Sequence, residues 1–599
     1  MNRINATRFM TQEEMKEKYN SVSLDGKETC NAAGVPLLVS DKKVYIDTED
    51  NHTIIFGSTG SKKTRLFGMP TVELLSRAGE SFIVTDPKGE IYERSSAQAA
   101  ARGYQIFCLN LRDFRKGVTW NPLALPYDYY HRGEKSKAIE MVSEFAKFLV
   151  GECDKDPFWP NTAMDVIIGL ILILLESADK SECHMKSVLE LWESYLENKS
   201  KWLSLVKIKY GNSLIKRKLS SLDNESERTV GSIEAFVAMG LNKLIVNEDF
   251  VSFLSQDGMD LNEVTQKKTA IYLIIPDENK FYHFIASVFM EQLYEVLIKE
   301  AQKQPKNRLK IRMNYIIDEF ANIPKMQNMD SMITAGRSRN IRFNLIIQSK
   351  MQLEEKYGEM ASVICDNCNN WIYLYSKDYD LLNEISKLCG TVIYDNNMTV
   401  PLISEFDLQH LKKDEGEALV LAGRNYPCIV NLADIDEYPV IECNNAEGIF
   451  YETQKWYPIN VFFLKKDSPR RLYVYEDRIV RAKGLLKEFI RDNTWLVGTC
   501  NGMIFVEELV NEEDVKSGIA ILKLCLNKFS ELSEAKELTW YTSHEIMSMT
   551  YYDEMKKHPE KVFMTIDELG KDNFQIVKNN LLEKIVKTEE TGGTKYGEL

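Results

Sequence analysis

A glycine-rich loop that directly follows a short apolar run constrains the fold of this chain more than any other feature. Residues 52–56 form a strand-like run, and the next eight residues match the phosphate-binding loop pattern at every defined position except one. These eight are Gly57, Ser58, Thr59, Gly60, Ser61, Lys62, Lys63 and Thr64. Because such a loop joins a strand to a helix, it predicts an α/β fold built on a parallel sheet.

The residue types of the loop predict how it holds a nucleotide. Gly57 lets the strand turn sharply, and the backbone amides up to Thr64 surround a phosphate. Lys63 reaches the β- and γ-phosphates, and the Thr64 hydroxyl ligates magnesium. ATP and Mg²⁺ are therefore the expected cofactors, and the alternative is a glycine-rich turn that binds nothing.

Lys62 stands at the one exceptional position, where a glycine is usual. A side chain there either crowds the nucleotide or takes a backbone angle that only glycine adopts cheaply, at a cost of about 1 kcal/mol or more. The remaining interpretation is that Lys62 points to solvent and adds a positive charge. Impaired nucleotide binding is thus one expectation for this loop.

Short apolar runs alternate with helical patterns on both sides of a long helical stretch. The predicted strands lie at residues 52–56, 81–85, 104–109, 270–275, 314–317, 343–347, 371–375 and 418–421. Residues 138–150 and 163–176 show helix-period hydrophobics, and the apolar run 166–175 is too short to span a bilayer, so it predicts a buried core helix. We therefore expect a sheet built from two separated segments.

These patterns divide the chain into five parts. They are an amino-terminal extension (1–43), a first nucleotide-binding segment (44–125), an inserted all-α domain (126–260), a second nucleotide-binding segment (261–440) and a carboxy-terminal α+β domain (441–599). In the last part we expect strands at residues 471–475, 495–497 and 503–506 and a helix at residues 516–529. Only the extreme tails are expected to lie loose.

Acidic and amide side chains follow two of the predicted strands. Asp318 and Glu319 end one strand, where Asp318 is expected to hold magnesium through water and Glu319 to polarise the attacking water. Gln348 and Ser349 follow the next strand. Two interpretations stay open there. Gln348 contacts the γ-phosphate or the water that attacks it, or Gln348 and Ser349 together cap a helix.

A compact basic cluster lies between those two strands. Arg337 and Arg339 supply an arginine finger to a neighbouring subunit, contact DNA phosphates, or stand on a solvated helix end. The formal net charge of −14 argues against non-specific coating of nucleic acid, so any DNA contact must be local. Scattered cysteines and a polar amino terminus without a signal pattern indicate a reducing cytosol.

Taken in order, the motifs resemble the TraG-type coupling proteins of type IV secretion. Besides the loop, the most specific strings are Asp-Pro-Lys-Gly-Glu at residues 86–90 and Asp-Glu-Phe-Ala-Asn at residues 318–322, and the resemblance covers about residues 44–440. It implies a RecA-like P-loop NTPase core with an inserted all-α domain, assembled as a homo-hexamer that hydrolyses ATP to transfer DNA. The implied partners are single-stranded DNA, relaxase and relaxosome proteins, and type IV secretion channel components.

Three features depart from the family pattern. Lys62 replaces a glycine, and the segment after residue 440 has no counterpart. The usual pair of amino-terminal transmembrane helices is also missing, so we expect a cytoplasmic protein that meets the inner face of the membrane only through partners. Two alternatives to an ATP-driven coupling protein follow: a scaffold for conjugation partners with a weakened nucleotide site, or another RecA-like DNA pump such as a chromosome-segregation translocase.

Overall fold

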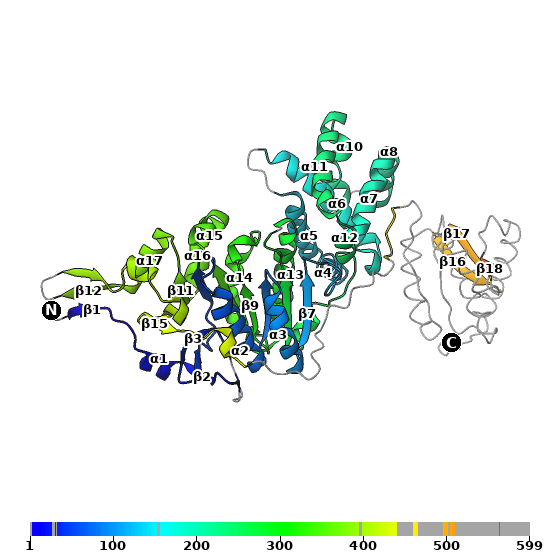
Figure 1. The fold of residues 1–599 in the computed structure, drawn as a ribbon. Coiled ribbons are helices and arrows are strands. Elements are labelled where there is room, and N and C mark those ends of the chain that lie inside the picture. The colour runs from blue at the N-terminus through cyan, green and yellow to red at the C-terminus, as the bar shows by residue number, and fades with distance from the viewer. Residues whose placement is uncertain are drawn as a thin grey trace, which may run out of the picture. The chain divides into compact units, whose positions relative to one another are not determined.

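The computed structural model describes most of the chain up to residue 439 and short stretches beyond it. The described residues are 3–26, 30–31, 33–151, 156–211, 213–245, 247–278, 280–394, 398–439, 459–464, 495–500, 503–508 and 562–563. Figure 1 shows the chain coloured along its sequence, and its residues divide into two compact units. One comprises Met1–Met164, His184–Lys186 and Gly231–Ile459, and the other Asp165–Cys183, Ser187–Val230 and Asn460–Leu599.

A nine-stranded sheet forms the centre of the first unit. Its order is β15-β14-β11-β5-β10-β9-β6-β8-β7, parallel from β11 to β7 and antiparallel at β14 and β15. Eight strands match predicted ones to within two residues, which confirms the α/β fold, and β15 is the addition. The strands are β5 (Thr53–Gly57), β6 (Ser81–Asp86), β7 (Gln105–Asn110), β8 (Thr269–Ile274), β9 (Met313–Ile317), β10 (Ile341–Ile347), β11 (Asn370–Tyr375), β14 (Glu417–Ala422) and β15 (Cys428–Asn431).

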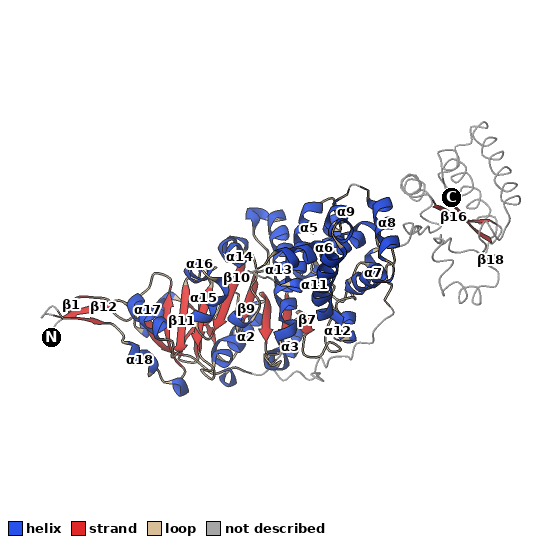
Figure 2. Ribbon diagram, turned by 90° about the horizontal axis from the view of Figure 1, so that it is seen from above, coloured by secondary structure: helices blue, strands red, loops and turns tan. Residues whose placement is uncertain are grey.

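Helices cover both faces of this sheet. α2 (Met69–Ala78) and α3 (Glu90–Ala101) lie along one face, and α13 (His283–Lys303) and α14 (Met329–Gly336) along the other (Figure 2). Every residue of β5, β6, β8, β9 and β10 is buried. Strands covered on both faces need apolar residues throughout, which is why they appear in the sequence as short continuous apolar runs.

The amino-terminal stretch is folded, so the expectation of a loose amino-terminal tail is wrong. Three of its strands form a small antiparallel sheet, and a fourth pairs with β12 (Thr391–Tyr394), which also pairs with β13 (Thr399–Pro401). Strands of four or five residues are too short to show a clear hydrophobic period. The amino-terminal elements are β1 (Arg3–Ala6), α1 (Gln12–Lys18), β2 (Asn20–Ser23), β3 (Pro36–Ser40) and β4 (Lys43–Ile46).

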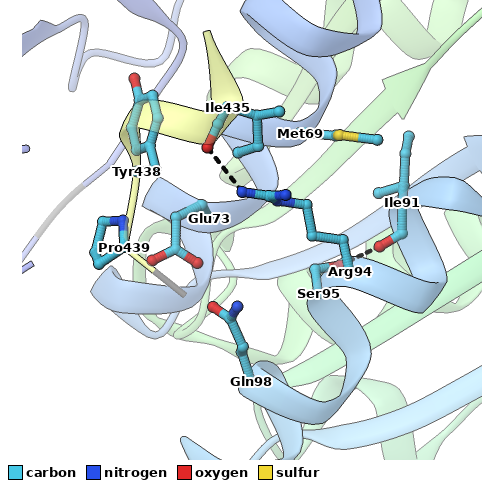
Figure 3. A pocket seen from close by; sticks show the side chains of 9 residues that line it. All are labelled: Met69, Glu73, Ile91, Arg94, Ser95, Gln98, Ile435, Tyr438 and Pro439. Atoms are coloured by element: carbon cyan, nitrogen blue, oxygen red, sulfur yellow. Dashed lines mark hydrogen bonds between the residues drawn. The ribbon is translucent and has the colours of Figure 1, made fainter. Parts of the chain in front are cut away.

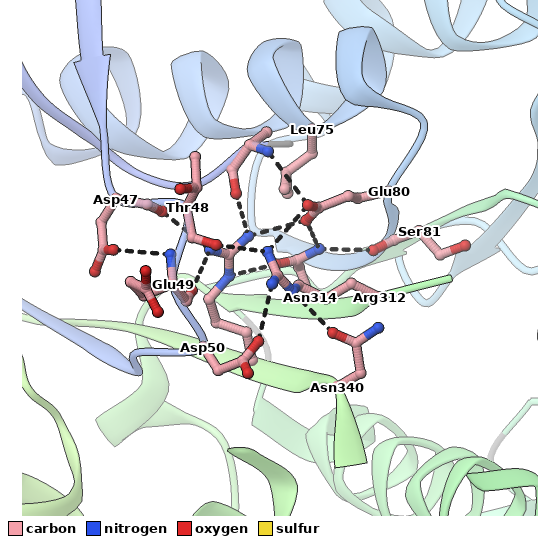
Figure 4. Close-up of polar contacts among 12 residues, drawn as sticks. Asp47, Thr48, Glu49, Asp50, Leu75, Glu80, Ser81, Arg312, Asn314 and Asn340 are labelled. Carbon is pink, nitrogen blue, oxygen red and sulfur yellow. Dashed lines mark hydrogen bonds and ion pairs between the residues drawn. The ribbon is translucent and has the colours of Figure 1, made fainter. Parts of the chain in front are cut away.

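A buried ion-pair network fastens this amino-terminal segment to the large sheet (Figure 4). Arg342 of β10 donates to Glu80 over 2.9 Å and to the Asn314 side chain over 2.7 Å, and also to three backbone carbonyls between residues 33 and 49. Arg312 donates to Glu80 over 3.1 Å and to Asp50 over 2.9 Å. Burial lowers the pKa of Arg342 to about 10, so this guanidinium stays charged at neutral pH and depends on its acceptors.

Every described element between β7 and β8 is helical. One of them, α6, is long and apolar enough to cross a membrane by length and composition, but 67% of its most apolar window is buried. Residues 166–175 within it, predicted as a core helix, are all buried. The α-helices are α4 (Ala124–His131), α5 (Lys135–Val150), α6 (Phe158–Ser177), α7 (Met185–Glu197), α8 (Lys199–Tyr210), α9 (Leu214–Lys218), α10 (Ser221–Asn224), α11 (Glu227–Ile245) and α12 (Glu248–Phe253).

The described residues after residue 464 form a small sheet. β16 (Trp495–Cys500) and β17 (Met503–Glu508) pair antiparallel, and β18 (Val562–Phe563) pairs parallel with β17. The first two overlap the strands predicted at residues 495–497 and 503–506. The predicted strand at residues 471–475 and the predicted helix at residues 516–529 lie outside the described residues.

Candidate nucleotide-binding site

The glycine-rich loop lies where the sequence places it, between β5 and the helical turn Thr64–Gly68 that continues into α2. The backbone amide of Ser58 is tied to the Tyr375 carbonyl at the end of β11 over 2.9 Å. A Cβ atom on Gly57 would stand 2.4 Å from Ser61 Oγ and 2.8 Å from Lys63 Cγ. Only glycine fits at residue 57, because the loop folds back closely over the end of its own strand.

Lys62 has the backbone of a left-handed residue, with φ at +63°. Side chains other than glycine rarely adopt this region, and holding one there costs on the order of 1–3 kcal/mol. Among the expectations for Lys62, the structure therefore shows the one in which it takes a backbone angle usual for glycine. The loop keeps its turn despite the lysine.

Thr64 and Asp318 meet at the centre of the site. The Thr64 hydroxyl donates to Asp318 Oδ2 over 2.8 Å. Burial raises the pKa of Asp318 to about 6, and the neighbouring negative charge of Glu319 adds to this effect. A hydroxyl and a carboxylate oxygen are hard donors of the kind that Mg²⁺ prefers, so this pair fits a magnesium ion.

Lys63 and Glu319 form a second contact across the same space. Lys63 Nζ lies 3.6 Å from Glu319 Oε1 and 3.4 Å from the Ser58 carbonyl oxygen, and the lysine side chain is 5% exposed. Glu319, the second residue after β9, has a left-handed backbone with φ at +55°. This turn brings its carboxylate back toward the loop.

Gln348 joins the loop to the carboxylate. Its amide nitrogen donates to Glu319 Oε2 over 2.7 Å, and its amide oxygen accepts from the Thr59 hydroxyl over 3.2 Å. Asn322 also donates to Glu319 Oε2, over 3.0 Å. Ser349 accepts from the Met351 amide and caps α15 (Lys350–Tyr357). Gln348 thus lies at the predicted site, and Ser349 is the residue of the pair that caps a helix.

The loop also contains an unsatisfied polar atom. Ser61 Oγ is buried and has no hydrogen-bond partner among the described residues. A buried hydroxyl without a partner costs about 1–3 kcal/mol, so the loop is built to receive a polar group. With the lysine, the threonine hydroxyl and the carboxylates around it, a nucleotide phosphate with Mg²⁺ fits these residues.

The last two residues of β6, Thr85 and Asp86, complete the surroundings, and their roles are not part of the sequence expectation. The Thr85 hydroxyl donates to the Asp318 backbone carbonyl over 2.9 Å. Asp86 accepts from the amides of Gly89 and Tyr92 over 2.9 and 2.8 Å, and burial raises its pKa to about 6. Within the Asp-Pro-Lys-Gly-Glu string, Asp86 therefore holds the turn that follows β6.

Arg65, the residue after Thr64, anchors a segment from the far end of the core. It donates to Asp434 over 3.0 Å and also pairs with Asp436. Burial opposes the ionisation of Asp434, but the hydrogen bond from Arg65 and the charges of Arg65 and Lys62 lower its pKa overall. In the sequence, the only signal for this contact is that Arg65 directly follows the last residue of the loop.

Beyond Arg65 a small pocket separates α2 and α3 from residues 435–439. Figure 3 shows Arg94 of α3 reaching across it to the Ile435 carbonyl, a hydrogen bond of 2.9 Å. Met69 and Tyr438 also line this pocket. The contacts of Arg65 and Arg94 together clamp residues 434–438 onto the helices that follow the loop and β6.

Arg337 and Arg339 do not join the loop of their own chain. They form a short turn just before β10, whereas the loop follows the carboxyl end of the parallel neighbour β5. The seven residues of β10 separate the two ends by roughly 20 Å. Arg337 is exposed and Arg339 is half-buried.

Comparisons with known proteins agree on one family. A family model described as type IV secretory system conjugative DNA transfer matches residues 4–401. The chain is 23% identical over 384 residues to protein VirD4 of Rhizobium radiobacter, covering 62% of this chain and 53% of the relative. It is 22% identical over 390 residues to conjugal transfer protein TraG of the same organism, covering 63% and 57%. The chain thus spans little more than half the length of these curated relatives.

Solved structures share the fold. Plasmid coupling protein TrwB in complex with the non-hydrolysable ATP analogue ADPNP matches with a TM-score of 0.54 and 15% identity, over 76% of this chain and 98% of that one. TrwB in complex with ADP and Mg²⁺ matches with the same score and identity, over 75% and 97%. The expected RecA-like P-loop core is confirmed by this likeness.

Proposed function

Because the chain belongs to the type IV secretory system conjugative DNA transfer family, we propose that it binds and hydrolyses ATP to pass DNA to a type IV secretion channel. The family match confirms the resemblance seen in the sequence. The observation that carries the proposal is the meeting of Lys63 and Thr64, after β5, with Asp318 and Glu319, after β9, across the single strand β10. Among proteins of this fold, TrwB has been described with ADP and Mg²⁺.

The residues take separate roles in this proposal. The amides of residues 57–64 and the Lys63 ammonium hold the phosphates, and Thr64 and Asp318 hold Mg²⁺. When bound, Mg²⁺ neutralises charge on the phosphates. Glu319 accepts a proton from the attacking water, and its hydrogen bonds from Gln348 and Asn322 fix the direction of its carboxylate.

The partners follow from the family. We infer a homo-hexameric ring at the inner face of the membrane, recruited by channel components, that receives single-stranded DNA from relaxase and relaxosome proteins. The opposite positions of the loop and of Arg337 on the sheet support a ring, because an arginine that is remote from its own site is free to serve a neighbour's.

A catalytically weakened scaffold is the second candidate, and the Lys62 backbone favours it. Holding Lys62 at a left-handed backbone angle costs on the order of 1–3 kcal/mol, which weakens the loop conformation that binds phosphate. The other interpretation, a different RecA-like DNA pump, has less support, since the matching family is that of conjugative DNA transfer.

The test is ATP turnover by the purified protein with Mg²⁺, in the presence and absence of single-stranded DNA. The proposal expects turnover that rises with DNA and depends on Mg²⁺, together with loss of DNA transfer between cells carrying Lys63→Ala. Lys303→Ala, at the carboxyl end of α13, is the matched control and should behave as wild type. DNA transfer that survives Lys63→Ala, with no turnover by the wild type, would favour the scaffold.

A further inference from the structure

The first helical turn after the phosphate loop is wider than a turn of α-helix. Thr64–Gly68 is a π-helix, and the Met69 amide donates to the Thr64 carbonyl five residues earlier. The π-helix is rare in proteins and is found mostly as a single turn joined to an α-helix, often at a functional site. Among the described residues, no side chain caps the start of this turn. Contacts from outside the turn therefore help to hold it.

Arg65, the second residue of the π turn, is held by residues 434–438, which we call the strap. Its Nε donates to Asp434 Oδ2 over 3.0 Å, and its Nη2 donates to the other oxygen of the same carboxylate and to Asp436. A two-pronged contact of this kind fixes the orientation of a guanidinium as well as its position. The Asp434 side chain is 23% exposed and that of Asp436 is 63% exposed, so Asp434 is the stronger partner.

The strap is itself fixed in place. A capping box formed by Asp434 and Glu437 closes its single 3₁₀ turn. Ile435 and Tyr438 are buried in the core that also contains the apolar side chains of the π turn. Arg94 of α3 donates to the Ile435 carbonyl over 2.9 Å, as Figure 3 shows. The strap is thus a firm support to which Arg65 is tied.

We propose that Asp434 and Arg65 are positioning residues for nucleotide binding, because their ion pair holds the π turn in the form that places Lys63 and Thr64 for a phosphate. The inference rests on the proposed function. Thr64 opens the π turn, and its hydroxyl reaches Asp318 over 2.8 Å. A change from π-helix to α-helix shortens the turn by one residue and rotates its first residue. The ion pair opposes that change from the outer side of the turn.

This role predicts a separation of KM from kcat. Without the ion pair, the loop spends part of its time in forms that do not bind phosphate, and the apparent dissociation constant rises as the competent fraction falls. Saturating ATP draws the loop back into the competent form, so kcat changes little. An ion pair that only stabilised the fold would instead lower the amount of folded protein, and therefore the rate per total protein, without changing KM.

Asp434→Asn is the decisive variant. Asparagine caps a helical turn about as well as aspartate, so the strap keeps its shape, but the amide lacks the charge and one of the two acceptor oxygens. We expect KM for ATP to rise about tenfold, the effect of losing one charge-assisted hydrogen bond, with kcat per folded molecule within about twofold of wild type. Calorimetry with Mg²⁺ and a non-hydrolysable ATP analogue should show the same loss of affinity without turnover.

Arg65→Gln tests the same pair from the loop. It should also raise KM, and adding Asp434→Asn to it should raise KM no further, because the pair is already broken. Asp249→Asn is the matched control. Asp249 accepts from Arg115 Nε over 2.9 Å with a similar exposure of 28%, and that pair lies beyond the edge strand β7, remote from the loop. The control should leave KM unchanged, and independent effects in the double variant would contradict the inference.

Hydrogen exchange in the protein without nucleotide follows the turn directly. The backbone amides of residues 64–68 should exchange faster in Asp434→Asn than in wild type, whereas those of β6 should not change. Unchanged exchange in these residues, or an unchanged affinity for the ATP analogue, overturns the inference even where Lys63→Ala loses binding as the proposed function requires. A wild type that binds no Mg·ATP overturns both claims.

Discussion

The Thr64 hydroxyl donates a hydrogen bond of 2.8 Å to the Asp318 carboxylate, although 254 positions separate the two residues in the chain. The bond joins the two segments of the sheet, one before the helical stretch and one after it. Because β10 lies between β5 and β9, the ends of these two strands are held one strand apart. Any loss of register in β10 would separate the hydroxyl from the carboxylate.

The raised pKa of Asp318 predicts how pH affects the protein without ligands. Its folded-state pKa of about 6 lies above the ordinary value near 4, so the folded state binds more protons between pH 4 and pH 6. The stability contributed by this group is complete below pH 4 and is lost as pH rises through 6. Asp318→Asn should therefore be more stable than wild type at pH 7.5, and the difference should shrink at pH 4.5. Urea unfolding at both pH values measures this, and an equal difference at both would contradict it.

Magnesium reverses this effect, since the ion binds the ionised carboxylate. Magnesium affinity in the presence of a non-hydrolysable ATP analogue should fall more steeply below pH 6 in the wild type than in Asp318→Asn, where only the phosphates of the analogue bind protons in competition with the ion. Calorimetric titration of both proteins at several pH values measures the difference. An equal pH dependence in the two proteins would show that Asp318 does not hold the ion.

Lys62→Gly should relieve backbone strain in the loop. Glycine tolerates φ at +63°, and the gain of about 1 kcal/mol or more is partly offset by the larger entropy that glycine loses on folding. We expect a small rise in stability and tighter ATP binding. Lys306→Gly is the matched control, because Lys306 has nearly the same φ, +61°, outside the site. Tighter ATP binding in Lys306→Gly, or unchanged ATP affinity in Lys62→Gly, would show that backbone strain at residue 62 does not weaken nucleotide binding.

Arg342→Met should destabilise the core. The variant leaves Glu80 buried with one cation fewer and unties the segment before β5, so we expect a loss of about 3–5 kcal/mol in the free energy of unfolding. Arg308→Met, which removes a more exposed partner of Asp50, should cost less than about 1 kcal/mol. Chemical denaturation measures both. Similar small losses would mean that the buried network contributes little.

Arg337 and Arg339 predict complementation between subunits. If one of them serves the neighbouring site, its alanine variant binds ATP normally but loses turnover by about 10³-fold or more. Mixing that variant with Glu319→Gln should restore part of the activity, because some interfaces then combine an intact arginine with an intact Glu319. No recovery on mixing would exclude a role in the neighbouring site and favour DNA contact, which a DNA-binding assay on the same variants measures.

The sequence predicted the elements whose burial leaves a clear pattern. β5, β9 and β10 are apolar along their length, and the glycine-rich loop and Asp318-Glu319 follow them at strand ends. The amino-terminal strands escaped prediction because segments of four or five residues are too short to show a clear hydrophobic period. Contacts such as Gln348 with Glu319, or Arg65 with Asp434, depend on how separate segments pack and leave no local signature.

The most direct test of the central claim separates ATP binding from hydrolysis in two variants. Titration of Mg·ATP by calorimetry, followed by phosphate release, should show that Lys63→Ala loses binding, whereas Glu319→Gln binds as tightly as wild type and releases no phosphate. Equal binding by wild type and Lys63→Ala, or phosphate release by Glu319→Gln at the wild-type rate, would contradict it.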